Sequence, residues 1–90
     1  MLRLFKTKTN KLEKKLSIMT DITIIANHIY RNGISQYYID KIYSYIRELK
    51  GIGFKATEVK NIVKSALLQS LLSDNDSILI LRTYKDLWTI

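Results

Sequence analysis

The segment between Ser35 and Gly51 constrains the fold most strongly, because its apolar residues recur at helical spacing and both of its ends carry helix signals. On a helical wheel, one arc of about 80° holds Ile39, Ile42, Ile46 and Leu49, which defines a face that packs on a core. Ser35 can cap the start of such a helix, and Gly51 can end it in a left-handed conformation. We therefore predict a helix over residues 36–50.

Four tyrosines lie on this predicted helix, which raises the question of whether they bind a ligand or fill a core. Tyr38 and Tyr45 lie along one border of the apolar arc, and Tyr43 lies along the other. Tyrosines at such borders commonly bury the ring and leave the hydroxyl in water. We expect these three to be structural, whereas Tyr37 points into the polar face and is free for another role.

Two further helices flank this one. The first is predicted over residues 21–32, ending at Gly33, and an earlier turn or two of helix is indicated by Leu12, Leu16 and Met19. The other is predicted from a cap at Thr57 to about Leu72. Its apolar stripe consists of Val59, Ile62, Val63, Ala66 and Leu67. Residues 19–90 are thus expected to form one small helical domain.

The C-terminal part shows a different pattern. Residues 73–77, SDNDS, predict a break, and the apolar run Ile78 to Leu81 predicts a strand that pairs with residues 87–90. The expected fold class is mainly α, a three-helix core with a short C-terminal strand or β-hairpin. That is the element order of a winged-helix module, an analogy of architecture alone. A helical bundle whose C-terminal strand pairs with a second copy is the alternative.

Basic residues are concentrated at the N-terminus. The net charge is +7, and the first 15 residues contribute six basic groups against Glu13. We interpret residues 1–18 as a basic arm, partly helical, which can bind phosphates by displacing condensed counterions. An organelle presequence or a solvated terminus are the alternatives. The candidate phosphate contacts of the arm are Arg3, Lys6, Lys8, Lys11, Lys14 and Lys15.

The third predicted helix carries the best candidate recognition surface. Lys60, Asn61 and Lys64 are spaced to share one exposed face, and Lys55 precedes the helix. Lysine binds phosphate and asparagine can pair with adenine in the major groove of DNA. An ordinary solvated helix face has the same composition.

An interface is indicated at the end of the same helix, where Leu68 and Leu72 lie nearly opposite its main apolar stripe. The C-terminal segment, the N-terminal helix or a second copy must cover them, and Trp88 either covers the core or anchors the interface. A chain of 90 residues is marginal alone, so we expect a homodimer.

Catalysis is not expected. The chain has no cysteine and the single histidine His28, so familiar nucleophile and zinc constellations are incomplete, and no catalytic residue, metal or cofactor is assigned. No apolar run approaches the roughly 20 residues that span a bilayer. We expect a cytoplasmic or otherwise intracellular protein, in the host cell if it is viral.

The leading functional hypothesis is a small nucleic-acid-binding protein, with DNA favoured over RNA. Abundant lysine, isoleucine, tyrosine and asparagine indicate A/T-rich codons, so a viral, phage or mobile-element regulator fits. The alternative is a protein-binding module or inhibitor that docks an acidic host protein through the arm or through Leu68, Leu72 and Trp88. A structural homo-oligomer is the third hypothesis.

Overall fold

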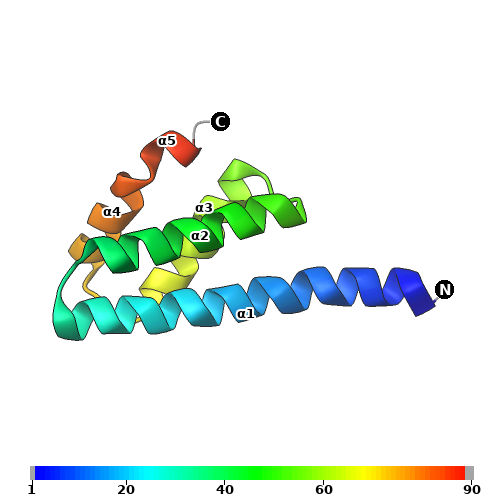
Figure 1. Ribbon diagram of the computed structural model, residues 1–90, viewed down its shortest axis with the longest axis horizontal. Coiled ribbons are helices and arrows are strands. Elements are labelled where there is room, and N and C mark those ends of the chain that lie inside the picture. The colour runs from blue at the N-terminus through cyan, green and yellow to red at the C-terminus, as the bar shows by residue number, and fades with distance from the viewer. Residues whose placement is uncertain (1, 89–90) are drawn as a thin grey trace.

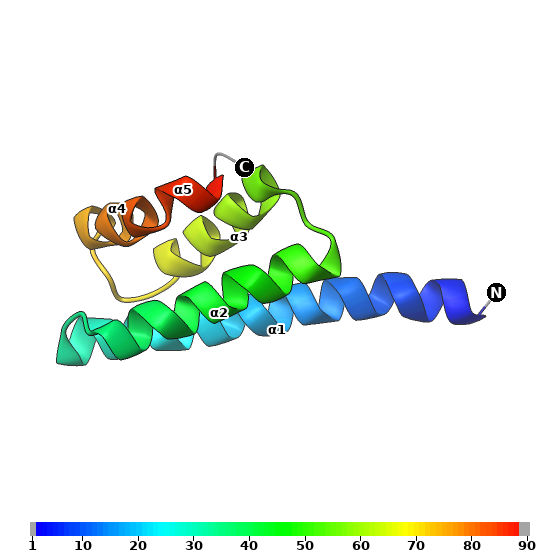
Figure 2. The same cartoon turned by 45° about the horizontal axis from the view of Figure 1, so that its top comes forward.

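The computed structural model describes the backbone of residues 2–88 and the side chains of residues 10–88. This part of the chain forms five helices: α1 (Leu2–Asn32), α2 (Gln36–Ile52), α3 (Ala56–Leu68), α4 (Asp74–Thr83) and α5 (Lys85–Trp88). Helices α1 and α2 run antiparallel side by side, and α4 and α5 lie on the other side of α3 (Figures 1 and 2). Helix α3 contacts the four other helices and is therefore the centre of the fold.

Helix α1 is 31 residues long and sets the shape of the molecule. At a rise of 1.5 Å per residue its length is about 46 Å, close to the longest dimension of 47 Å. It continues without a break through residue 18, so the basic segment is helical and leads directly into the core helix. Ile18, Ile22 and Ile29 on its second half are buried, whereas its first turns project past the corner between α2 and α3 (Figure 1).

Two glycines produce the turns between the first three helices. Gly33 has a φ of +85° and follows α1, as predicted. Helix α2 begins after Ser35, as predicted, although the side chain of Ser35 makes no capping hydrogen bond. The helix continues through Gly51 and ends at Gly53, whose φ is +118°. The N–H of Gly53 donates to the carbonyls of Leu49 and Lys50, so the second glycine of the pair rather than the first provides the left-handed cap.

Helix α3 differs at both ends from the prediction. It begins after Lys55 rather than Thr57, because the carboxylate of Glu58 accepts a hydrogen bond from the backbone N–H of Lys55 at 3.1 Å. It ends at Leu68 rather than near Leu72. The following loop is held against α1, where the side-chain oxygen of Asn27 accepts from the N–H of Leu71 at 2.8 Å.

The predicted C-terminal strand or hairpin is wrong, and with it the winged-helix arrangement, because residues 2–88 contain no strand. Ile78 to Leu81 lie within α4, and Leu87 lies in α5, while residues 89–90 of the expected hairpin lie outside the described part. The residues interpreted as a break begin a helix instead. The side chain of Ser73 caps α4 by accepting a hydrogen bond from the N–H of Asp76 at 3.2 Å. The carboxylates of Asp74 and Asp76 in the first turn interact favourably with the positive end of the helix dipole.

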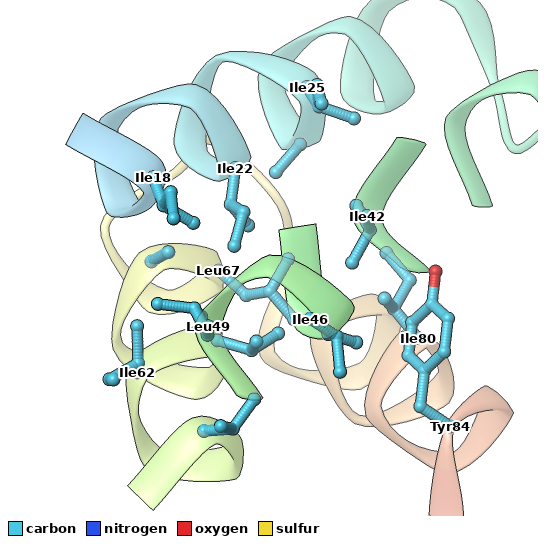
Figure 3. Close-up of a cluster of buried hydrophobic side chains, with 14 of the residues drawn as sticks. Ile18, Ile22, Ile25, Ile42, Ile46, Leu49, Ile62, Leu67, Ile80 and Tyr84 are labelled. Carbon is cyan, nitrogen blue, oxygen red and sulfur yellow. The ribbon is translucent and has the colours of Figure 1, made fainter. Parts of the chain in front are cut away.

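The buried residues from all of α1 to α4 meet in one core. Figure 3 shows Ile22 of α1, Ile46 and Leu49 of α2 and Leu67 of α3 converging, with Ile80 and Tyr84 closing the side nearest α4. Tyr84 is 4 % exposed, and its hydroxyl donates to the carbonyl of Ile39 in α2 at 2.7 Å. The C-terminal helices are thus fastened to the core by helical packing rather than by strand pairing.

Candidate functional site

A basic groove runs between α3 and the C-terminal pair of α4 and α5. It has a volume of about 300 Å³, and its lining residues are Lys60, Lys64, Ile78, Leu81, Arg82, Lys85 and Trp88. We call this set the basic groove. Four of its lining residues are cations and none is acidic. Its positive charge is therefore not cancelled within the lining, unlike that of the polar face of α2, where Lys41 and Arg47 alternate with Asp40 and Glu48.

The two sides of the basic groove follow from helical spacing. Val59 and Val63 of α3 are fully buried, which turns Lys60 and Lys64, one position further on, toward the surface. On the opposite side, the burial of Ile80 and Tyr84 leaves Arg82 and Lys85 exposed at the end of α4 and the start of α5. The core residues of both helices therefore determine where the four charges lie.

The other lining residues of the basic groove, Ile78, Leu81 and Trp88, are apolar, and the tryptophan is held in place. The indole N–H of Trp88 donates to the carbonyl of Leu81 at 3.0 Å. Its ring also meets the ring of Tyr84 edge-on, with centroids 6.2 Å apart and planes at 67°. Lys50 of α2 reaches the carbonyl of Leu87 at 2.9 Å and ties α5 to the body. The half-buried indole is thus preorganised beside four cations.

The structure separates the residues that were predicted to act together on α3. Lys60 and Lys64 line the basic groove, but Asn61 lines a different groove, between α1 and α3, together with Lys15 and Glu58. That second groove holds about 390 Å³ and contains an acid, so its charge is mixed. Lys55 is exposed at the start of α3, outside both sets of lining residues.

The basic residues of α1 lie along a helix. The ammonium of Lys11 lies 4.6 Å from the ring centroid of Phe54, so it packs against the corner between α2 and α3. Lys14 is exposed, and Lys15 is half-buried in the groove between α1 and α3. Arg3, Lys6 and Lys8 belong to the backbone of α1, and their side chains lie outside the described residues.

The three residues named for an interface have different environments. Leu68 is 52 % exposed, whereas Leu72 is 8 % exposed and packs in the core. Trp88 packs against the same core from the basic groove. Leu71 is 55 % exposed beside Leu68, so these two leucines form the apolar surface at this end of α3.

Sequence reasoning missed Arg82 and Lys85. Both were assigned to a hairpin, in which their side chains would have had no defined relation to α3. The signal that could have located them is the cap at Ser73, because a helix from Asp74 onward buries Ile80 and Tyr84 and places Arg82 on the outer side.

Another pocket, distinct from both grooves, lies between α1 and α2 and has a volume of about 360 Å³. Its polar and aromatic lining residues are Asp21, His28, Tyr37, Tyr38, Lys41 and Tyr45. Tyr37 is 64 % exposed, as the wheel predicted, and Tyr38 and Tyr45 pack against the core. Tyr43, which was expected to be structural as well, is 41 % exposed. Burial, and next the carboxylate of Asp21, raises the pKa of Tyr45. The pocket is lined by both Asp21 and Lys41, so its charge is mixed, whereas the charged lining residues of the basic groove are all positive.

The described residues form neither a metal site nor a membrane span. Among the described residues, no group of three or more histidine, cysteine, aspartate or glutamate side chains is placed to hold a metal ion. None of the helices formed by residues 2–88 combines the length and the apolar character that a membrane span requires.

Comparison of the chain with protein-family models, with curated proteins and with solved structures gives no match.

Proposed function

We propose that this protein binds nucleic acid and that the basic groove holds its phosphates. The observation that carries the proposal is the convergence of Lys60, Lys64, Arg82 and Lys85 around one concave surface with no acidic lining residue. Clustered cations release condensed counterions when they bind phosphates, which gives an affinity that depends on salt and little on sequence.

The net charge of the whole chain supports the same proposal. The net charge is +7, and the exposed Lys14 and the cation of Lys11 add positive potential along α1. Such a field attracts a polyanion from a distance and increases the rate of association. Helix α1 supplies additional affinity in this account, whereas the basic groove supplies the site.

Electrophoretic mobility shifts over a series of salt concentrations test the proposal. Each phosphate contact contributes about 0.7 to the logarithmic salt slope on single strands and about 0.9 on duplex DNA. The double variant Lys60→Gln, Lys64→Gln should therefore lower the slope by roughly 1.4 to 1.8. Lys41→Gln is the control for lost charge, because Lys41 is exposed on α2 and lines the tyrosine pocket instead.

The proposal is refuted if neither single-stranded nor duplex nucleic acid shifts the protein at low salt. It is also refuted if Lys41→Gln lowers the salt slope as much per charge as the groove variant, because binding would then depend on the overall positive charge and not on the basic groove.

A protein partner is the second candidate function, and the exposed leucines at the end of α3 favour it. Leu68 and Leu71 are each more than half exposed and adjoin the loop that Asn27 holds. An apolar pair on a basic protein suits an acidic partner or a second copy. A pull-down after nuclease treatment, compared with Leu68→Ser, distinguishes this function, because a protein partner survives nuclease and is lost in the variant.

A further inference from the structure

The surroundings of α3 bear on which form of nucleic acid can reach the basic groove. A helix that reads the major groove must present an uncovered face to a groove about 12 Å wide. In this protein Lys60 and Lys64 of α3 line a concavity whose other lining residues come from α4 and α5. Figure 2 shows these two helices lying alongside α3. A duplex, whose phosphates lie on a convex rod, can touch the rim of such a concavity but cannot enter it.

The size and the apolar lining residues of the basic groove suit an unpaired base. A base in a duplex must be flipped out of its stack before it can enter a pocket, at a cost of a few kcal/mol. A base in a single strand is already free to enter. The apolar lining residues offered to it are Ile78, Leu81 and Trp88, in a volume of about 300 Å³.

The indole adds a fixed platform. Its N–H is already bonded to the carbonyl of Leu81 at 3.0 Å, and its ring is braced by Tyr84. A base that packs against Trp88 therefore needs little further ordering of the protein. Bases stack on aromatic side chains irrespective of their identity, so this contact is tolerant of sequence.

From these three features we infer that the basic groove binds a single strand, with one base against Trp88 and the neighbouring phosphates between the cations of α3 and those of α4 and α5. This inference rests on the proposed nucleic-acid function and specifies its ligand. The single strand can be DNA or RNA, because phosphates and base faces are common to both.

Fluorescence of the intact protein tests the inference, because Trp88 is the only tryptophan of the chain. The protein is titrated with oligothymidylate of about 12 nucleotides, within the range of known single-strand site sizes. Oligouridylate and a mixed duplex of equal length, and inorganic polyphosphate of equal charge, are the parallel probes. We expect either oligonucleotide to change the emission and to bind more tightly than the duplex. Comparison of oligouridylate with oligodeoxyuridylate, which differ only at the 2′ position, identifies the favoured sugar.

Three results overturn the inference while leaving the proposed function intact: a duplex that binds as tightly as the single strands, single-strand binding with no change in the emission of Trp88, or polyphosphate that binds as tightly as the oligonucleotides. Failure of every nucleic acid to bind refutes the proposed function itself, and the inference with it.

Two variants separate stacking from folding. Trp88→Leu should weaken single-strand binding about tenfold or more, measured by anisotropy of a labelled oligonucleotide, because the loss of one base stack has that magnitude. Trp88→Phe keeps an aromatic ring and should retain most of the affinity. Equal losses in the two variants, with unchanged circular dichroism, would contradict a stacking role, and Lys41→Gln serves as the unaffected control.

Discussion

Tyr84 offers the sharpest test of how the C-terminal helices are attached. Its ring is buried, and its hydroxyl donates to the carbonyl of Ile39 at 2.7 Å, pointing toward α2 in Figure 3. Tyr84→Phe keeps the ring and removes this hydrogen bond, which is worth about 1 kcal/mol. For a domain of this size, that loss corresponds to a fall in melting temperature of roughly 4–8 °C.

The same substitution should change the response to alkaline pH. Burial, and to a lesser extent the Asp40 carboxylate, raises the pKa of Tyr84 well above the usual value of about 10. The folded state keeps the phenol protonated, whereas the unfolded chain ionises above about pH 10. The contribution of Tyr84 to stability is therefore fully present below pH 10 and is lost as the pH rises toward the folded pKa.

The size of this effect can be worked out from the unfolded state. Ionisation of one phenol with a pKa of about 10 stabilises the unfolded chain by about 1.4 kcal/mol at pH 11. The free energy of unfolding of the wild type therefore falls by this amount, whereas that of Tyr84→Phe does not. At pH 7 the variant should be less stable than the wild type by about 1 kcal/mol. At pH 11 this difference in the free energy of unfolding should vanish or change sign.

Urea unfolding followed by circular dichroism at both pH values measures the difference, and taking the difference cancels the other groups that titrate. Tyr37→Phe is the matched control, since its ring is 64 % exposed, and it should change stability by less than about 0.5 kcal/mol. Parallel pH profiles for the wild type and Tyr84→Phe would refute the burial of Tyr84 and the docking of α4 that depends on it.

Further predictions concern the start of α4, the core and the N-terminal helix. Urea unfolding measures the effects of the three substitutions. Ser73→Ala removes the cap of α4 and should lower the free energy of unfolding by about 1 kcal/mol, whereas an unchanged value would argue against the helix start. Ser77→Ala should instead raise it by on the order of 1 kcal/mol, because the buried hydroxyl of Ser77 has no hydrogen-bond partner among the described residues. Ile46→Ala should cost about 2–5 kcal/mol, since Ile46 is fully buried at the centre of the core. Deletion of residues 1–15 should leave the protein folded, because Ile18 is the first buried residue among the side chains of α1 that the structure describes, and should flatten the salt dependence of nucleic-acid binding; an unchanged slope would remove α1 from the interface.

Sequence reasoning located α2 well, because the signals there agree with one another. The aliphatic stripe, the position of Ser35 and the border positions of Tyr38 and Tyr45 all indicate one helix with one buried face. Gly33 was correctly predicted to end the preceding helix for the same reason, because no other signal near it conflicts with a left-handed glycine. Local rules were sufficient where they were consistent.

The same rules failed at the C-terminus, where two signals conflicted. Ile78 to Leu81 is a continuous apolar run that periodicity alone cannot assign to a strand or a helix. The serine and aspartates before it were interpreted as a turn, although the same residue types also cap helices. Tertiary packing decided the outcome, because only a helix buries Ser77, Ile80 and Tyr84 together against the core.

That error also limited the candidate site. Lys60 and Lys64 could be predicted from one helix, but the opposite wall requires Arg82 and Lys85 to be placed by a second helix that packs on α3. Asn61 was grouped with the lysines by spacing, and the packing of α1 draws it into another groove. A site built across elements depends on contacts that spacing within one element does not contain.

The most direct test of the central claim is a two-dimensional ¹⁵N–¹H correlation spectrum of the labelled protein during titration with oligothymidylate. A chain of 10.5 kDa gives resolved signals, and its single tryptophan gives one indole resonance. We predict that shift changes concentrate on the indole N–H of Trp88 and on the amides of Lys60, Lys64, Arg82 and Lys85. Changes confined to the pocket between α1 and α2, with the indole resonance unmoved at saturation, would contradict the assignment of the basic groove as the nucleic-acid site.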